Sequence, residues 1–219
     1  MKFEQCRKFR EDYQARSYLK YYHVALHLLV NLVLILIAVL ILYFQFNDEL
    51  NLSPLLIIAS LGLWGILEYG IHRFLMHKKL GSMNLAYKEH TLNHHFYYVD
   101  KFNFTTTQKD FVRIFFQPLD VVLIIYCANF LFAFMLYRLV SHNFGLHFFL
   151  VGNAYYVLYE FLHYIYHSNK DSFFQKIGLF KWLIRHHHIH HDQNQMNDGN
   201  FSLLFPLLDR LFGTYLKRE

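Results

Sequence analysis

Histidine is the residue type whose placement in this sequence points most directly to chemistry. Twelve of the sixteen histidines fall in four short clusters, at positions 72–77, 90–95, 163–167 and 186–191. The neutral imidazole ring is a good ligand for divalent first-row transition metals. Two histidines four positions apart on a helix lie on the same face, where both rings can reach one ion. Because such spacings recur in separate clusters, the sequence predicts a metal site built mainly from imidazole.

Two of the clusters have spacings that fit a regular helix. His163 and His167 are four residues apart, which places them about 40° apart around a helix axis. The offsets of three and four among His187, His190 and His191 also bring these side chains to one face. Each of the two clusters is therefore expected to present its rings to a metal from a single helix.

The other two clusters do not fit a straight helix. His72 and His77 are five residues apart, which is roughly 140° around a regular helix. This pair is expected either to straddle a helix end or to serve two different metal ions. In the next cluster His90 and His94 share a face but His95 does not, so a local bulge or a break in the helix is expected there.

Some polar residues beside the clusters are candidates for supporting the ligands. Two of them are glutamates that precede a cluster by three or four residues, near the end of an apolar run. Such a carboxylate can accept the proton on the second ring nitrogen of a ligand, here His72 or His163. An ion pair with Arg73 or Lys181 is the alternative, and the sequence does not decide between the two. The candidates are Glu68, Glu160, His186 and His188.

Long uncharged runs place the chain among membrane proteins. Of the 219 residues, 55% are apolar and 20% aromatic, which is more than a soluble domain usually has. The first run is expected to be a membrane span and not a signal peptide, because it follows a polar segment and is too long for a signal core. The sequence predicts an all-α integral membrane protein with four transmembrane helices, at about 25–46, 54–76, 118–140 and 146–167, and a turn at 141–145.

The basic residues lie outside these runs, and they predict an orientation. The formal net charge is +5, and lysine and arginine gather before the first span, after the second and in the C-terminal tail. By the positive-inside rule both termini are expected to be cytoplasmic, with residues 1–24 as a basic cytoplasmic segment. All four clusters then lie at one membrane face, in a helical cytoplasmic cap. This pattern also accounts for the charge without nucleic-acid binding.

Two motifs resemble those of the fatty acid hydroxylase superfamily, which includes sterol desaturases and fatty acid 2-hydroxylases. The first is EYGIHRFLMH at 68–77, and the second is the closing segment NFS…PLLDRLFGT at 200–214. The resemblance runs over about 68–215, within a chain that we interpret as a single domain, 1–219. Three residues separate His90 from His94, where fatty acid 2-hydroxylases typically have two. The resemblance implies that two metal ions, iron in the active enzyme and zinc in some purified samples, are held by His72, His77, His90, His94, His95, His163, His167, His187, His190 and His191.

The resemblance also implies a reaction. It predicts a non-haem di-iron oxidoreductase that uses O2 to hydroxylate or desaturate a lipid, with a fatty acyl chain as the favoured substrate. The segment before the first span is too short for the cytochrome b5 domain of some eukaryotic members, so electrons are expected from a separate donor such as cytochrome b5 or ferredoxin. The expected location is a bacterial inner membrane or the endoplasmic reticulum.

Two alternatives to this function stay open. A sterol- or carotenoid-modifying member of the same superfamily would have the same clusters. A histidine-rich membrane metal transporter is an alternative of another class. Transporters usually hold their ligands near the bilayer midplane, whereas these clusters are expected at the ends of spans and in the soluble segments. That placement favours the enzyme.

Overall fold

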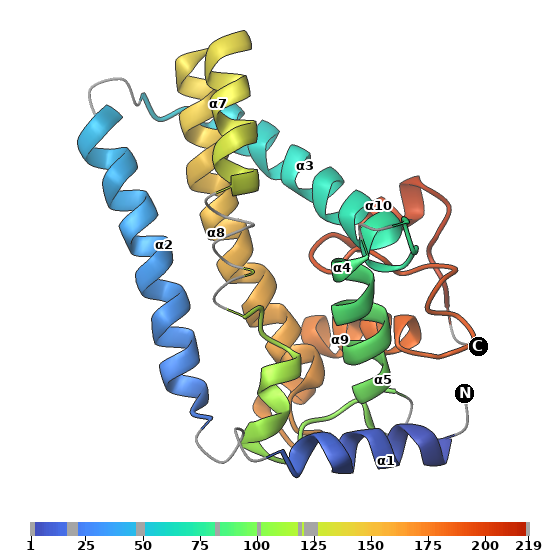
Figure 1. The fold of residues 1–219 in the computed structure, drawn as a ribbon. Helices are drawn as coiled ribbons and strands as arrows, with labels where there is room; N and C mark the ends of the chain where they lie inside the picture. Colours follow the sequence, from blue (N-terminus) through green and yellow to red (C-terminus); the bar gives the residue numbers. More distant parts are fainter. Residues whose placement is uncertain are drawn as a thin grey trace. The chain divides into compact units, whose positions relative to one another are not determined.

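The structure is a computed structural model that describes residues 3–16, 22–46, 51–81, 84–99, 102–117, 120 and 127–217. In these residues the regular elements are helices and no strand is found, which confirms the predicted all-α class. The chain forms two compact units, each built from separate stretches of sequence (Figure 1). Unit 1 comprises Met1–Tyr22, Gly65–Phe115 and Tyr159–Glu219, and unit 2 comprises His23–Trp64 and Phe116–Leu158.

Unit 2 consists of apolar helices. It contains α2 (Val24–Phe46), α7 (Phe130–Leu139) and the first parts of α3 (Pro54–Gly70) and α8 (His142–His167). Two stretches, Val24–Ile41 and Pro54–Met76, are long and apolar enough to span a membrane, and most of their residues are not buried within the protein. A soluble fold would cover such apolar side chains, whereas a helix in lipid can leave them facing outward.

The predicted spans agree in part with these helices. The first matches α2 closely, because an uncharged run defines its limits, and the second, 54–76, covers α3 together with the π-helix Ile71–Met76 that continues it. Of the predicted third span, residues 118, 119 and 121–126 lie outside the described part of the chain. The predicted turn at 141–145 is wrong, because α8 already begins at His142. The Ser141 hydroxyl accepts the N–H of Phe144 at 3.1 Å and so acts as a helix cap.

A glycine allows α7 and α8 to approach closely within unit 2. A Cβ atom on Gly145 would lie 2.6 Å from both the Ala133 carbonyl oxygen and the Tyr137 nitrogen. We expect Gly145→Ala to force the two helices apart and to lower the free energy of unfolding by about 1–3 kcal/mol. The thermal unfolding midpoint in detergent measures this loss. Gly62→Ala is the control, because a Cβ there meets no atom within 4 Å; equal midpoints for the two variants would contradict the prediction.

Unit 1 contains the shorter helices and all four histidine clusters. A π-helix, Ile71–Met76, continues α3, and a second π-helix, Lys88–His94, lies between the one-turn helices α4 (Leu85–Tyr87) and α5 (His95–Tyr97). The other helices of the unit are α1 (Phe3–Gln14), a 3₁₀-helix at Gln108–Arg113, another at Phe173–Lys176, α9 (Gly178–His190) and α10 (Pro206–Leu211), together with the end of α8.

The basic N-terminal segment is part of this unit's core. Helix α1 lies against α5 (Figure 1), with Phe9 edge-on to Phe96 and Tyr13 edge-on to Tyr97. Arg10 is 5% exposed, and its guanidinium forms an ion pair with the fully buried carboxylate of Asp110 at 2.9 Å. This pair ties α1 to the segment that follows α5.

Candidate metal centre

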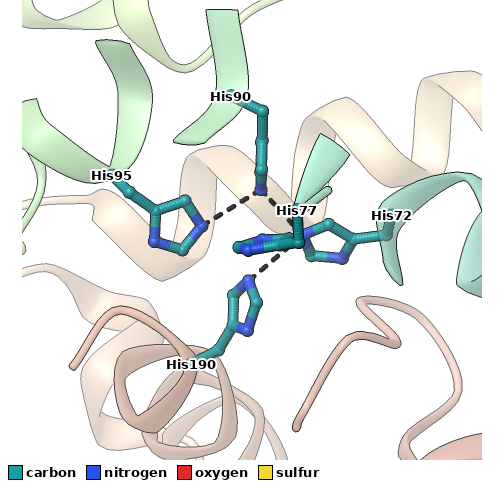
Figure 2. Close-up of side chains that lie close together, drawn as sticks. All are labelled: His72, His77, His90, His95 and His190. Atoms are coloured by element: carbon teal, nitrogen blue, oxygen red, sulfur yellow. Dashed lines mark hydrogen bonds between the residues drawn. The ribbon is translucent and has the colours of Figure 1, made fainter. Parts of the chain in front are cut away.

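The ten predicted ligand histidines gather in two groups of five within unit 1. Within each group one ring nitrogen per residue lies within 4.8 Å of the others, and all ten residues are buried. Figure 2 shows the first group, whose rings come from three separate parts of the chain and point toward one another. Group 1 is His72, His77, His90, His95 and His190; group 2 is His94, His163, His167, His187 and His191.

Two π-helical turns explain how histidines five positions apart reach one site. In a π-helix each N–H bonds to the carbonyl five residues earlier, so residues five apart lie one above the other. The His77 N–H donates to the His72 carbonyl at 3.2 Å, and the His95 N–H donates to the His90 carbonyl in the same way. The bulge predicted for the second cluster is therefore present. The pair His72 and His77 shares one group, and it straddles the end of the π-helix, as one of the two predicted solutions had it, because His77 is the C-cap residue.

The division into groups differs from the prediction in two places. His90 and His94 were expected to act together, but His94 belongs to group 2. His190 was expected to act with its neighbour His191, but it belongs to group 1. In both cases adjacent residues point to different groups, and the rings of His95 and His191 stack between the groups with centroids 4.1 Å apart. The two candidate metal positions are therefore neighbours.

Main-chain carbonyls fix the orientation of many of these rings. A carbonyl oxygen can only accept, so a ring whose Nδ1 bonds to one must carry its proton there and present a bare Nε2. The Nδ1–H of a ligand histidine is commonly held in this way. The pairs are His72 with Phe201, His94 with Arg113 (2.6 Å), His167 with Asn103 (2.8 Å), His190 with Gly199 (2.9 Å) and His191 with Tyr98.

The bare nitrogens face each other at distances that suit a cation. Nε2 of His72 lies 3.1 Å from Nε2 of His190, and the corresponding atoms of His94 and His191 are 3.2 Å apart. Two lone pairs at this distance repel unless a positive charge lies between them. Two imidazole nitrogens bound about 2.1 Å from one metal ion would be about 3.0–3.4 Å apart. Nε2 of His77 is also buried, and it has no hydrogen-bond partner among the described residues. The close ring nitrogens in both groups fit a metal ion in each.

Burial keeps the imidazoles neutral, which is the form that binds metal. Desolvation lowers the pKa of His94 to about 3, although its bond to the Arg113 carbonyl acts in the opposite direction. Desolvation likewise lowers the pKa of His187 and His191 far below the ordinary value of 6.5, and neighbouring imidazoles add to the effect. At neutral pH these rings are therefore uncharged.

The predicted role of Glu68 at His72 is wrong. The Nδ1 proton of His72 goes to the Phe201 carbonyl, while a carboxylate oxygen of Glu68 accepts the main-chain N–H of Leu203 at 2.8 Å. Glu68 thus holds the chain next to Phe201. Glu160 is 6% exposed. Burial raises the pKa of Tyr22, and the charge of Glu160 adds to this effect.

The two remaining candidates, His186 and His188, lie outside both groups. His186 is buried, with its Nε2 3.2 Å from a carboxylate oxygen of Asp209. His188 donates from Nε2 to the Tyr166 carbonyl at 2.7 Å. Neither ring therefore belongs to a candidate metal group, and their predicted role in supporting the ligands stays a prediction.

Sequence reasoning missed two buried aspartates, Asp110 and Asp209, both 0% exposed. Asp209 belongs to the closing segment that carries the resemblance, but its carboxylate had no predicted role. Asp110 stands in an unremarkable stretch, TTTQKDFVR, where the only usable signal was a Thr-x-x-Asp pattern of the helix-capping kind. Both carboxylates contact the segments that supply carbonyls to the histidines.

Comparison with known proteins agrees with the geometry. The model of the fatty acid hydroxylase family matches residues 57–214. The ceramide very long chain fatty acid hydroxylase SCS7 of Saccharomyces cerevisiae is 31% identical over 163 residues, which is 70% of this chain and 36% of that protein. The chain thus spans about a third of this relative. A solved structure of full-length scs7p, with only its hydroxylase domain visible, has a TM-score of 0.57 and 27% identity, covering 84% of this chain and 66% of the other. A match over most of its length, on the segment that holds all ten histidines, shows that this chain belongs to the fatty acid hydroxylase family.

Proposed function

We propose that this protein is a membrane-bound di-iron oxygenase that hydroxylates a lipid, with a fatty acyl chain as the favoured substrate. The observation that carries the proposal is the pair of adjacent, buried groups of five histidines. Membership of the fatty acid hydroxylase family and likeness to a ceramide fatty acid hydroxylase support the reaction and the lipid class. The histidine-rich donor set distinguishes the centre from the carboxylate-rich di-iron sites of soluble bundles.

The proposed reaction replaces a C–H bond of the lipid with C–OH. One oxygen atom of O2 enters the product and the other leaves as water, with two electrons supplied by a separate donor such as cytochrome b5 or ferredoxin and two protons taken from the solvent. Bound iron supplies the O2 and one-electron chemistry. The chain's own residues hold the metal, keep the ligands neutral through burial and exclude bulk water from the centre.

We propose that the lipid reaches the centre from the bilayer. The outward-facing apolar residues of α2 and α3 support membrane insertion, and the basic residues outside the apolar runs favour four spans with both termini cytoplasmic. In this orientation the histidine clusters lie at the cytoplasmic ends of the second and fourth predicted spans and in the segments that follow them.

The function can be tested by lipid mass spectrometry of cells that express the wild-type chain or His163→Ala, grown under ¹⁸O2. We expect a lipid that gains one labelled oxygen in the wild-type cells only. A product that loses two hydrogens without a label would instead identify desaturation. Metal uptake into reconstituted vesicles, with no oxidised lipid, would contradict the proposal and favour the transporter.

Metal analysis of the purified protein gives a second, independent test. We expect two iron or zinc ions per chain in the wild type, because each group offers five imidazoles. A stoichiometry of zero would contradict the proposal whatever the lipid profile shows. The exposed-residue variant Lys170→Ala serves as the control and should bind the same amount as the wild type.

A further inference from the structure

Each histidine group is supported by its own segment of main chain. In group 1 the carbonyls of Gly199 and Phe201 accept the Nδ1 protons of His190 and His72. In group 2 the carbonyls of Tyr98, Asn103 and Arg113, which hold His191, His167 and His94, lie in the 98–113 segment, of which residues 98, 99 and 102–113 are described. We call 199–202 the first support segment and 98–113 the second. In the described contacts, no carbonyl of the first support segment bonds to a ring of group 2, and no carbonyl of the second bonds to a ring of group 1.

Asp209 holds the first support segment at the peptide that faces His72. Its carboxylate accepts the N–H of Phe201 at 2.9 Å and that of Ser202 at 3.0 Å. The Ser202 N–H and the Phe201 carbonyl belong to the same peptide group, so this peptide lies between the Asp209 carboxylate and the His72 ring. Hydrogen bonds on both sides of one peptide polarise it and strengthen each other.

Asp209 also supports the carbonyl that faces His190, through Thr214. The peptide that joins Gly199 to Asn200 gives its carbonyl to His190 and its N–H to the Thr214 carbonyl at 2.8 Å. The Thr214 hydroxyl donates to Asp209 at 2.8 Å. The approach is close, because a Cβ on Gly199 would lie 2.0 Å from the Thr214 oxygen. Both carbonyls of the first support segment therefore depend on one carboxylate.

Asp110 has the corresponding position in the second support segment. Its carboxylate accepts the N–H of Thr106 at 2.6 Å and binds Arg10. The same guanidinium donates to the carbonyls of Phe102 at 2.8 Å and Phe104 at 2.9 Å, on either side of Asn103, the partner of His167.

The contacts of Asp110 extend to the other two partners in this segment. The Asp110 carbonyl accepts the hydroxyl proton of Tyr98, whose own carbonyl holds His191. Asp110 also lies in the 3₁₀-helix that ends at Arg113, the residue whose carbonyl holds His94. The Asn103 carbonyl is thus linked to the Asp110 carboxylate through Arg10, and the carbonyls of Tyr98 and Arg113 are linked to the main chain that this carboxylate anchors.

We infer that Asp209 and Asp110 are positioning residues, each responsible for one metal position, so that the two positions can be weakened separately. The inference rests on the proposed function, which requires a metal ion in each group. Neither carboxylate contacts a ligand ring in the described contacts, so both act through peptide groups. An asparagine has nearly the same volume as aspartate. At position 209 it turns an N–H₂ toward the main-chain N–H of Phe201 or of Ser202. At position 110 it removes the charge that holds the Arg10 guanidinium.

The test measures metal bound per chain in purified wild type, Asp209→Asn and Asp110→Asn during titration with a chelator. We expect the wild type to hold two ions, and each variant to hold one of them as the wild type does while releasing the other at about 10–100-fold lower chelator strength. Asp198→Asn is the matched control, because Asp198 is exposed and adjoins the first support segment; it should behave as the wild type.

Combination with ligand variants shows which ion is lost. Asp209→Asn combined with His190→Ala affects group 1 twice and should leave one tightly held ion. Asp209→Asn combined with His187→Ala affects both groups and should leave none. For Asp110→Asn the expectation is reversed: the double variant with His187→Ala should leave one tightly held ion, and the double variant with His190→Ala should leave none. This readout is a count of ions and does not depend on turnover.

Two results would overturn the inference while leaving the proposed function intact: both aspartate variants holding two ions as tightly as the wild type, or each losing both ions together. A wild type without two ions would overturn the proposed function and the inference with it.

If an asparagine variant does not fold, Thr214→Val and Arg10→Lys are milder variants that retain the carboxylates. Each should speed the release of a single ion several-fold, from group 1 and group 2 respectively, and equal release of both ions would contradict the inference.

Discussion

His187→Ala should lower the rate of lipid oxidation by more than about 100-fold and remove metal from group 2. Loss of a group that merely supports a ligand typically costs about 10–100-fold in affinity or activity, and His187 is placed as a ligand. Its Nε2 lies 3.1 Å from Nε2 of His167, and its ring is buried among the other rings of the group. Alanine leaves a cavity that water can fill only as a weaker ligand.

The neighbouring variant His186→Ala is the sharpest control for this prediction. Both side chains are buried, on adjacent residues of α9, so a general disturbance of the helix would affect both variants alike. His186 contacts Asp209, whose carboxylate keeps three other donors, from Phe201, Ser202 and Thr214. We therefore expect His186→Ala to lower the rate of lipid oxidation and the metal content much less than His187→Ala does. Initial rates of lipid oxidation and metal per chain measure the difference, and similar losses in both variants would remove His187 from the ligand set.

The gathering of the ten histidines was predictable because metal ligands must be particular side chains at particular spacings. Their division into two groups was not, since it depends on local backbone geometry. A regular helix would bring His90 together with His94, and only the π-helical turn pairs His90 with His95. Such a turn has no reliable signature in one sequence, although two histidines five apart in a predicted helix gave a reason to expect one.

The supports of the ligands were largely hidden from the sequence. The acceptors for the ring protons are main-chain carbonyls, and every residue type has one, so nothing in the residue identities of Asn103 or Phe201 marks the role. Glutamates beside the clusters were the natural candidates, yet Glu68 accepts a main-chain N–H instead. The role of Asp110 becomes visible only when it is seen in contact with Arg10, 100 positions away.

Arg10→Ala should lower the free energy of unfolding by about 3–5 kcal/mol, the usual cost of leaving one partner of a buried ion pair alone. Asp110 is fully buried, and Arg10 also donates to the carbonyls of Phe102 and Phe104, which would lose these bonds as well. The thermal unfolding midpoint in detergent measures the loss. Arg7→Ala is the matched control on the same helix, because Arg7 forms its ion pairs in solvent and such pairs contribute little.

The difference between the thermal unfolding midpoints of the wild type and Arg10→Ala should change with pH in one direction. Burial alone would raise the pKa of Asp110, but the Arg10 charge and the hydrogen bonds from Tyr97, Thr106 and Thr107 outweigh it and hold the pKa below the ordinary 3.8. A carboxyl group with a lowered pKa in the folded state stabilises that state above its unfolded pKa, and this contribution is lost as the pH falls through the folded value. The gap between the two midpoints should therefore stay constant from neutrality down to about pH 5 and narrow below pH 3.8. A gap that stayed constant through this acid range would mean that Arg10 does not change the protonation of Asp110, and Arg10 would then stabilise the segment through the Phe102 and Phe104 carbonyls alone.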